Sequence, residues 1–148
     1  MELKELFQEE NVKLDFNADN KEDALKKLSE LICKNREFLS TEEVFVILKE
    51  REELGSTGIG NGVAIPHGKI DIGNKIFGAI AISNNGIDFD AMDKKPVKIF
   101  VTLLAGKEAT SIHLKVLAKI SRILMDNKNR EQLINAKSFS EILKVFEK

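Results

Sequence analysis

Apolar residues recur at helical spacing in the first third of the chain. The segment after Asn20 places one set on a single helical face: Ala24, Leu25, Leu28, Leu31 and Ile32. A second helix is predicted to begin at Ser40, because Ser40 and Glu43 form a capping box that satisfies two backbone N–H groups. This second helix should end near Gly55, a residue that commonly follows the last helical turn.

Two more amphipathic helices are predicted in the last third. The longer one runs from about Ser111 to Met125 with these apolar residues on one side: Ile112, Val116, Leu117, Ile120, Ile123 and Leu124. A shorter helix follows Ser138, and Glu141 completes its capping box.

The middle of the chain is predicted to form strands. Residues 75–83 and 96–104 are compact apolar runs of strand length, typical of strands buried on both faces. Asn84–Gly86 and Asp93–Pro96 have the composition of turns and flank the segment 86–90. Two helices, a cluster of strands and further helices indicate an α/β fold: a single-domain sandwich, residues 1–148, with a central mixed β-sheet flanked by α-helices.

Composition narrows the function classes. A chain of 148 residues buries about 68–70% of its unfolded surface and needs no disulfide or metal for stability. Its 23 Lys+Arg and 24 Asp+Glu give a net charge of -1 without a basic stripe, so nucleic acid is not an expected partner. Cys33 is the single cysteine, which suits a reducing compartment. We find neither a signal peptide nor an apolar run of membrane-spanning length, and expect a soluble, cytoplasmic protein.

His67 is the strongest candidate for chemistry. It stands between a glycine-rich segment and Gly68, and Pro66 pushes the preceding residue into an extended conformation. The sequence therefore predicts an imidazole on a short, irregular, approachable segment, with Gly68 relieving crowding around the ring. A structural role for this histidine remains the alternative on the residues alone.

Arg51 is the second candidate. It follows Val44 by seven residues and Ile47 by four, which places it on the apolar stripe at the end of the second helix. It is either an anion clamp or a stem that covers the core with its charged end in water. The next segment offers amides and hydroxyls for oxygen anions: Ser56, Thr57, Gly58, Gly60, Asn61 and Gly62. Val63 replaces the third glycine of the dinucleotide motif, so a nucleotide site is not expected.

His113 is the third candidate. If Ser111 is the N-cap, His113 lies in the first helical turn, where the helix dipole disfavours imidazolium and favours a bound anion. A capping or surface histidine is the alternative. Because the two histidines are far apart in sequence and neither belongs to a local H-x-x-x-H or carboxylate pattern, no metal is expected.

Four segments together carry a resemblance to a known family. They are Arg51-Glu52, the run from Ser56 to Lys69 that contains Pro66-His67-Gly68, the run from Gly86 to Asp93, and His113-Leu114 with Leu117-Ala118. In these segments the chain closely resembles the IIA domain of the bacterial sugar phosphotransferase system, of the type-2 class that serves fructose, mannitol and nitrogen regulation. The resemblance covers nearly the whole chain, and its Pro-His-Gly run is specific.

The resemblance implies a phosphotransferase that needs no cofactor. In that family the histidine matching His67 accepts a phosphoryl group from the phosphocarrier HPr, and an active-site arginine and a second histidine match Arg51 and His113. The resemblance implies that the phosphoryl group is passed to a cysteine of a IIB domain in fructose-type sugar uptake. It also implies that the protein contacts the membrane only through the sugar permease. The alternative is a nitrogen-regulatory paralogue that controls partner proteins, and a metal-dependent hydrolase is a remote third reading. Where relatives often have a proline and an acidic residue, this chain has Ala105-Gly106-Lys107-Glu108, a departure that bears on partner preference.

Overall fold

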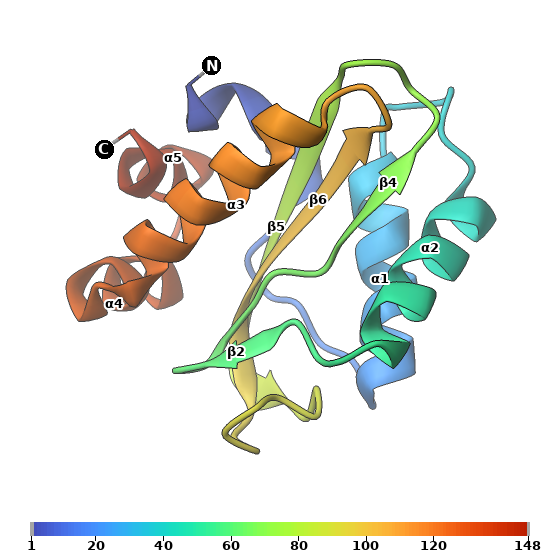
Figure 1. The fold of residues 1–148 in the computed structure, drawn as a ribbon. Helices are drawn as coiled ribbons and strands as arrows, with labels where there is room; N and C mark the ends of the chain where they lie inside the picture. Colours follow the sequence, from blue (N-terminus) through green and yellow to red (C-terminus); the bar gives the residue numbers. More distant parts are fainter. Residues whose placement is uncertain (1, 148) are drawn as a thin grey trace.

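A six-stranded mixed β-sheet lies between two layers of helices in the computed structural model, which describes residues 2–147 (Figure 1). The strands are β1 (Val12–Lys13), β2 (Gly58–Gly60), β3 (Val63–Ala64), β4 (His67–Ile70), β5 (Ile76–Ile87) and β6 (Val97–Gly106). Their order is β1-β5-β6-β3-β2, and β4 pairs with β6 further along the same side as β3. The central pair β5 and β6 is antiparallel, whereas β1, β3 and β4 run parallel to their neighbours in this core.

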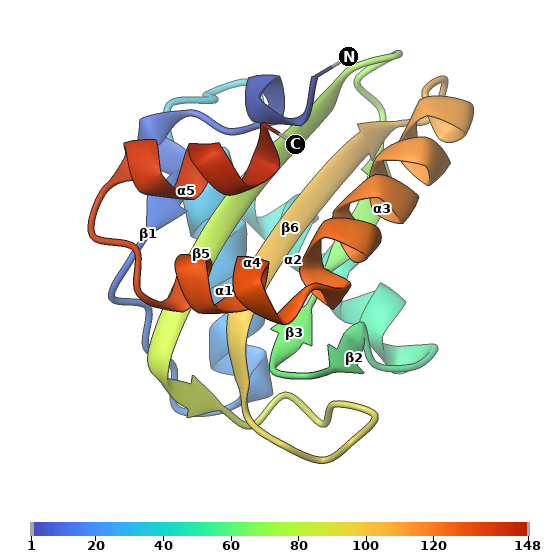
Figure 2. The same ribbon diagram turned by 90° about the vertical axis from the view of Figure 1, so that its left-hand side faces the viewer.

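The helices divide between the two faces of the sheet. They are the short 3-10 helices η1 (Leu3–Leu6) and η2 (Glu9–Asn11), and the α-helices α1 (Lys21–Cys33), α2 (Thr41–Glu53), α3 (Thr110–Met125), α4 (Asn127–Ile134) and α5 (Phe139–Phe146). Helices α1 and α2 cover one face, and η1, α3, α4 and α5 lie on the other (Figure 2). Within residues 2–147 no helix combines the length and apolar character needed to cross a membrane.

Strand β6 shows why both faces are covered. Ile99, Val101 and Leu103 point into the core shared with α3, α4 and α5, while Phe100 and Leu104 point into the core under α1 and α2. All five side chains are fully buried. A strand buried on both faces has a nearly continuous apolar sequence, which explains why this run was recognisable as a strand. The predicted α/β sandwich with a central mixed sheet is confirmed.

Three of the predicted helix starts are also confirmed. The Asn20 side chain accepts a hydrogen bond from the Asp23 N–H at 2.8 Å, and the Ser40 hydroxyl accepts one from the Glu43 N–H at 3.3 Å. At α5 the Ser138 hydroxyl accepts from the Glu141 N–H at 3.2 Å. Each cap satisfies one of the backbone donors that the first helical turn leaves without a partner.

The predicted start of α3 is one residue late, and the predicted N-cap, Ser111, is two residues late. Its N-cap is Ala109, no side chain caps it, and Ser111 lies inside the helix. The His113 N–H donates to the Ala109 carbonyl at 2.8 Å, so His113 is the fourth helical residue. Ile112, predicted on the apolar side, is 40% exposed. Its neighbour His113 occupies the buried position instead.

Two other predictions about the middle of the chain are wrong. Asn84–Gly86 is not a turn, because β5 continues to Ile87 through an irregularity in its pairing with β6, where Gly86 has a φ of 78°. The segment around His67 is not an irregular loop: β2, β3 and β4 form there. Helix α4 was not predicted, since few of its side chains are buried and its sequence is mostly polar.

Candidate active site

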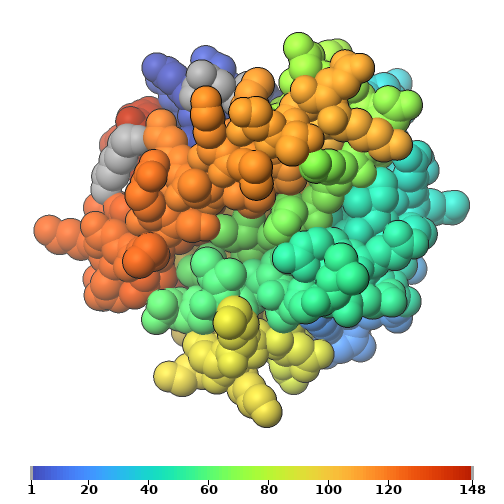
Figure 3. Space-filling view, in the orientation of Figure 1, coloured from blue at the N-terminus to red at the C-terminus, as the bar shows by residue number. Residues whose placement is uncertain are grey.

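His67 is the first residue of β4 and faces a cavity of about 600 Å³ between α2 and α3. The cavity is lined by Ile47, Glu50, Arg51, Leu54, His67, Gly68, Lys69, His113, Leu114 and Leu117. Figure 3 shows a hollow between the teal surface of α2 and the orange surface of α3, with green β4 residues at its floor. The structure therefore brings His67, Arg51 and His113 together, although they come from three different elements.

The His67 ring is held in one orientation by its own backbone. Its Nδ1 lies 2.8 Å from the carbonyl oxygen of Ile65, two residues earlier. Because a carbonyl can only accept a hydrogen bond, Nδ1 carries the proton and Nε2 keeps a free lone pair. Burial lowers the pKa of His67, the bond to Ile65 opposes this, and the positive charge of Arg51 lowers the pKa further. At neutral pH the ring is an uncharged, oriented nucleophile.

Gly68 allows α2 to pack directly on β4. A Cβ atom at this position would collide with the Cγ2 of Ile47, a side chain of α2. The crowding that this glycine prevents is therefore against the helix, and not around the His67 ring as predicted. The close packing also brings the last turn of α2, which carries Arg51, to the edge of the cavity.

His113 packs edge-on against His67 from the opposite wall. The two ring centroids are 5.5 Å apart with an interplanar angle of 76°, and His113 is only 4% exposed. Burial, followed by the nearby His67 and Lys69, lowers the pKa of His113 to about 4, so its ring is neutral at pH 7. Within residues 2–147 its Nε2 has no hydrogen-bond partner. Because an unsatisfied buried nitrogen is costly, a ligand that supplies a partner would be favoured at this point.

Arg51 lies beside the buried stripe of α2 rather than on it. The fully buried positions are Val44, Leu48 and Glu52, whereas Arg51 is half-buried and faces the cavity. One guanidinium nitrogen, Nη1, donates to the Gly55 carbonyl at 2.9 Å. Its other donors have no partner within the described part of the chain. A guanidinium that is fixed through one nitrogen and open at the others is suited to a phosphate or carboxylate.

Glu52, the residue after Arg51, is buried and holds the start of the next loop, a role that the sequence analysis did not predict. This buried carboxylate accepts hydrogen bonds from the Thr57 N–H at 3.1 Å and from the Thr57 hydroxyl, and forms an ion pair with Lys21 at 3.0 Å. The Thr57 hydroxyl therefore already has a partner inside the protein and is not available to a bound anion. The signal was present in the spacing, because Glu52 continues the buried series of Val44 and Leu48 at four-residue steps.

The predicted anion-binding loop does not reach the cavity. None of its six residues (Ser56, Thr57, Gly58, Gly60, Asn61 and Gly62) is among the lining residues. The Ser56 hydroxyl accepts from the Gly58 N–H at 3.0 Å and donates to the Phe89 carbonyl at 3.3 Å. The Asn61 N–H donates to the Asp93 carboxylate at 3.1 Å. These groups shape β2 and its contact with the segment before β6, so we assign no phosphoryl contact to them.

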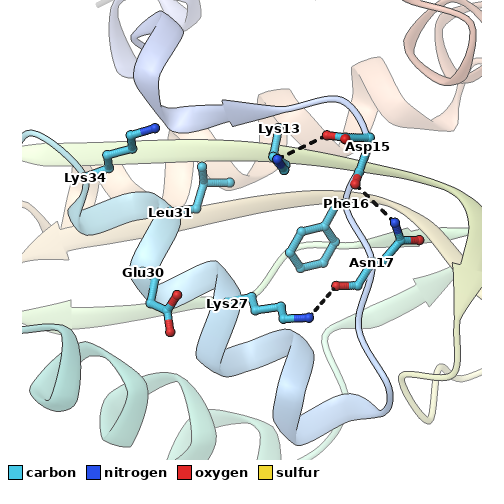
Figure 4. A pocket seen from close by; sticks show the side chains of 8 residues that line it. All are labelled: Lys13, Asp15, Phe16, Asn17, Lys27, Glu30, Leu31 and Lys34. Atoms are coloured by element: carbon cyan, nitrogen blue, oxygen red, sulfur yellow. Dashed lines mark hydrogen bonds and ion pairs between the residues drawn. The ribbon is translucent and has the colours of Figure 1, made fainter.

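A second cavity, of about 400 Å³, lies between α1 and the segment that follows β1 (Figure 4). We call it the α1 cavity, and it is lined by Lys13, Asp15, Phe16, Asn17, Lys27, Glu30, Leu31 and Lys34. Lys13 pairs with Asp15 at 3.2 Å, and the Lys27 ammonium donates to the Asn17 carbonyl at 3.0 Å. Neither cavity offers a metal site, since residues 2–147 contain no cluster of three His, Cys, Asp or Glu side chains that could hold an ion.

Comparison with known proteins identifies the family of the chain. Residues 5–148 match the family model described as "Phosphoenolpyruvate-dependent sugar phosphotransferase system, EIIA 2". A nitrogen regulatory protein of Bradyrhizobium diazoefficiens is 48% identical over 101 residues, which cover 67% of this chain and 66% of the relative. A fructose-specific EIIA component of Haloferax volcanii is 45% identical over 91 residues, covering 62% of this chain and 59% of the relative.

A solved structure is similar over almost the entire chain. The crystal structure of the nitrogen regulatory protein IIA-Ntr from Neisseria meningitidis superposes with a TM-score of 0.91 at 33% identity, covering 97% of this chain and 98% of that one. The family model and this structural match define a phosphotransferase-system IIA protein. The chain belongs to the EIIA type-2 family of the phosphoenolpyruvate-dependent sugar phosphotransferase system.

Proposed function

We propose that this protein is a phosphocarrier that accepts a phosphoryl group on Nε2 of His67. The observation that carries the proposal is the 2.8 Å contact between Nδ1 and the Ile65 carbonyl, which leaves Nε2 as the only ring nitrogen with a free lone pair. The proposal also rests on the family, whose name describes phosphoenolpyruvate-dependent phosphoryl transfer.

The donor in this scheme is a phosphorylated HPr-type protein that presents phosphohistidine. The donor's N–P bond breaks while a new N–P bond forms at His67, so the chemical free energy changes little. Catalysis then consists of positioning the two rings in line and stabilising the equatorial phosphoryl oxygens. Arg51 neutralises charge through its open donors, and His113 donates a hydrogen bond when its proton is on Nε2. The scheme needs no metal or organic cofactor.

Exposed apolar side chains at the mouth of the cavity suit a protein partner. Leu54 at the end of α2 is 85% exposed and Leu114 on α3 is 63% exposed, and both line the cavity. Large apolar side chains that ring a polar site are characteristic of protein–protein contact surfaces. They provide the area against which a donor or acceptor protein can dock over His67.

Of the two roles open to such a carrier, we favour nitrogen-type regulation, in which the phosphorylation state of His67 controls partner proteins. The match to the IIA-Ntr structure supports it, because that match spans nearly all of both chains. Delivery to the cysteine of a fructose-type IIB domain is the second candidate, supported by the Haloferax relative. Incubation of the phosphorylated protein with a fructose-type IIB domain distinguishes the two roles, because the IIB cysteine gains the phosphoryl group only in the second case.

The direct test of the carrier function is incubation with phosphoenolpyruvate, enzyme I and HPr, followed by intact-mass measurement. We expect one added phosphoryl group that is lost in acid, because phosphohistidine is acid-labile. His67→Ala should gain none. A wild-type protein that stays unmodified with active donor proteins, or a His67→Ala variant that is still modified, would refute the assignment.

A further inference from the structure

A groove on the other side of α3 is not used by the proposed phosphoryl transfer. It lies between η1 and α3, has a volume of about 250 Å³, and is lined by Leu3, Ile112, Lys115, Val116 and Lys119. Figure 2 shows η1 and α3 on the same face of the sheet. A neighbouring cavity of about 420 Å³ shares Leu3 and Lys119 with it, and its other lining residues are Glu2, Lys4, Phe146 and Glu147. We call the first of these the η1–α3 groove.

The floor of the η1–α3 groove is apolar and its rim is positive. Leu3 and Val116 are buried at 2% and 5% exposure, and Ile112 is 40% exposed beside them. Lys115 and Lys119 stand one helical turn apart above this floor. An apolar floor with charges only on the rim is the pattern of a peptide-binding groove.

The charged side chains of α3 are all positive. Between Thr110 and Met125 the helix carries Lys115, Lys119 and Arg122 and no Asp or Glu. None of these three cations has an ion pair or hydrogen bond to any of residues 2–147, whereas five other lysines pair with carboxylates. Because the chain as a whole is nearly neutral, this helix face is a local concentration of unpaired charge.

We propose that the η1–α3 groove binds an acidic segment of a partner protein, which places an apolar side chain over Leu3 and Val116 and carboxylates against Lys115 and Lys119. The groove and the His67 cavity lie on different sides of α3, since they share no lining residue. A partner bound in the groove therefore leaves His67 open to its phosphoryl donor. The site is an addition to the proposed carrier function and does not depend on it.

The probe for this site is a short fluorescein-labelled synthetic peptide that alternates leucine with glutamate, followed by fluorescence anisotropy. We expect saturable binding that weakens with added salt, and a loss of about tenfold or more in affinity for the double variant Lys115→Glu/Lys119→Glu, because reversed charges repel the carboxylates. The matched control is Lys13→Glu/Lys34→Glu, which makes the same charge change at the α1 cavity and should alter affinity by less than about threefold. A peptide with serine in place of leucine should bind far more weakly.

Four results would overturn the proposal: no binding of the leucine peptide to wild type, equal losses in the two double variants, equal binding of the serine peptide, or binding of phosphatidylglycerol vesicles in place of the peptide. The last result would assign the face to an anionic membrane surface. Both double variants should still become phosphorylated at His67. Loss of phosphorylation in either double variant would count against the proposed carrier function, whereas the peptide affinities alone decide whether the groove binds an acidic segment.

Discussion

The His67 cavity and the α1 cavity are comparable in size but differ in how their polar groups are satisfied. The α1 cavity (Figure 4) is lined by exposed charged side chains, several of which pair with one another or with nearby carbonyls. The His67 cavity contains an imidazole with a free lone pair and, facing it, the buried Nε2 of His113, which has no hydrogen-bond partner among residues 2–147. It also contains a guanidinium with open donors.

Volume alone therefore does not mark a functional site. Exposed ion pairs contribute little to the free energy of folding, and each charged group already has a partner, so such pairs leave no unsatisfied group for a ligand to bind. Buried groups without partners raise the free energy of the folded state, and proteins keep them where a ligand or reaction will use them. On this reasoning, changes in the His67 cavity should affect phosphoryl transfer strongly, and changes in the α1 cavity should not.

The largest effect after loss of His67 itself is expected at His113. Replacing it with Ala removes the hydrogen-bond donor that faces the phosphoryl group and should slow transfer by about 10²–10³-fold, whereas His113→Gln keeps a donor and should lose less. The measurement is the single-turnover rate of phosphoryl gain from phospho-HPr. Phosphorylation of His67 should still be complete in both variants given time. Equal rates for wild type, Gln and Ala would reduce His113 to a packing residue.

Arg51→Lys should slow transfer by roughly 10²-fold, because lysine keeps the charge but cannot match two phosphoryl oxygens with a planar pair of donors. Thermal stability should change little, since Arg51 makes a single hydrogen bond to Gly55 and is partly exposed. A melting curve and the same single-turnover assay separate the two properties. A large loss of stability with an unchanged rate would support a purely structural arginine.

Acid should destabilise the protein through His113. Its pKa is lowered from 6.5 to about 4 in the folded state, so the unfolded chain binds the proton first. Stability is therefore fully present above pH 6.5 and is lost as the pH falls toward 4, by up to about 3 kcal/mol at 1.36 kcal/mol per pKa unit. Urea unfolding at several pH values measures this, with His113→Gln as the variant in which the slope over this window should flatten. An unchanged slope in that variant would show that other groups cause the acid sensitivity.

The smallest effect is expected in the α1 cavity. Lys27→Met and Lys34→Met each remove a lysine from its lining, and Lys27 contributes only an exposed ion pair and one bond to a carbonyl. Transfer rates should stay within about twofold of wild type, because surface pairs contribute about 0–1 kcal/mol and neither lysine lines the His67 cavity. A tenfold loss of rate in either variant would show that the α1 cavity also contributes to phosphoryl transfer.

The parts of the fold that could be predicted from sequence have strong local signals. The caps at Asn20, Ser40 and Ser138 specify helix starts through side chains next to the helices they begin. Strands β5 and β6 are long and buried on both faces, which gives continuous apolar runs. In contrast, β1 to β4 have two to four residues each, too few to show alternation, and three of them include or adjoin glycines.

The site likewise has a part that the sequence predicts and a part that depends on distant contacts. His67, Arg51 and His113 were predicted as candidate site residues, and the structure places all three in one cavity. The contacts of the loop after α2 with Phe89 and Asp93 could not be predicted, because these partners lie 33 and 32 positions away in the sequence and only the tertiary structure brings them close. The partner of the His67 ring was also unpredictable, since any nearby carbonyl could have accepted its proton.

The ring nitrogen that carries the phosphoryl group tests the proposed chemistry of His67 directly. Nitrogen-15 NMR of the histidine rings, recorded on protein phosphorylated by phosphoenolpyruvate, enzyme I and HPr, distinguishes Nε2 from Nδ1 and His67 from His113. The bond from Nδ1 to Ile65 predicts a phosphoryl group on Nε2 of His67, with the Nδ1 proton retained. A phosphoryl group on Nδ1 of His67, or on either nitrogen of His113, would contradict the account.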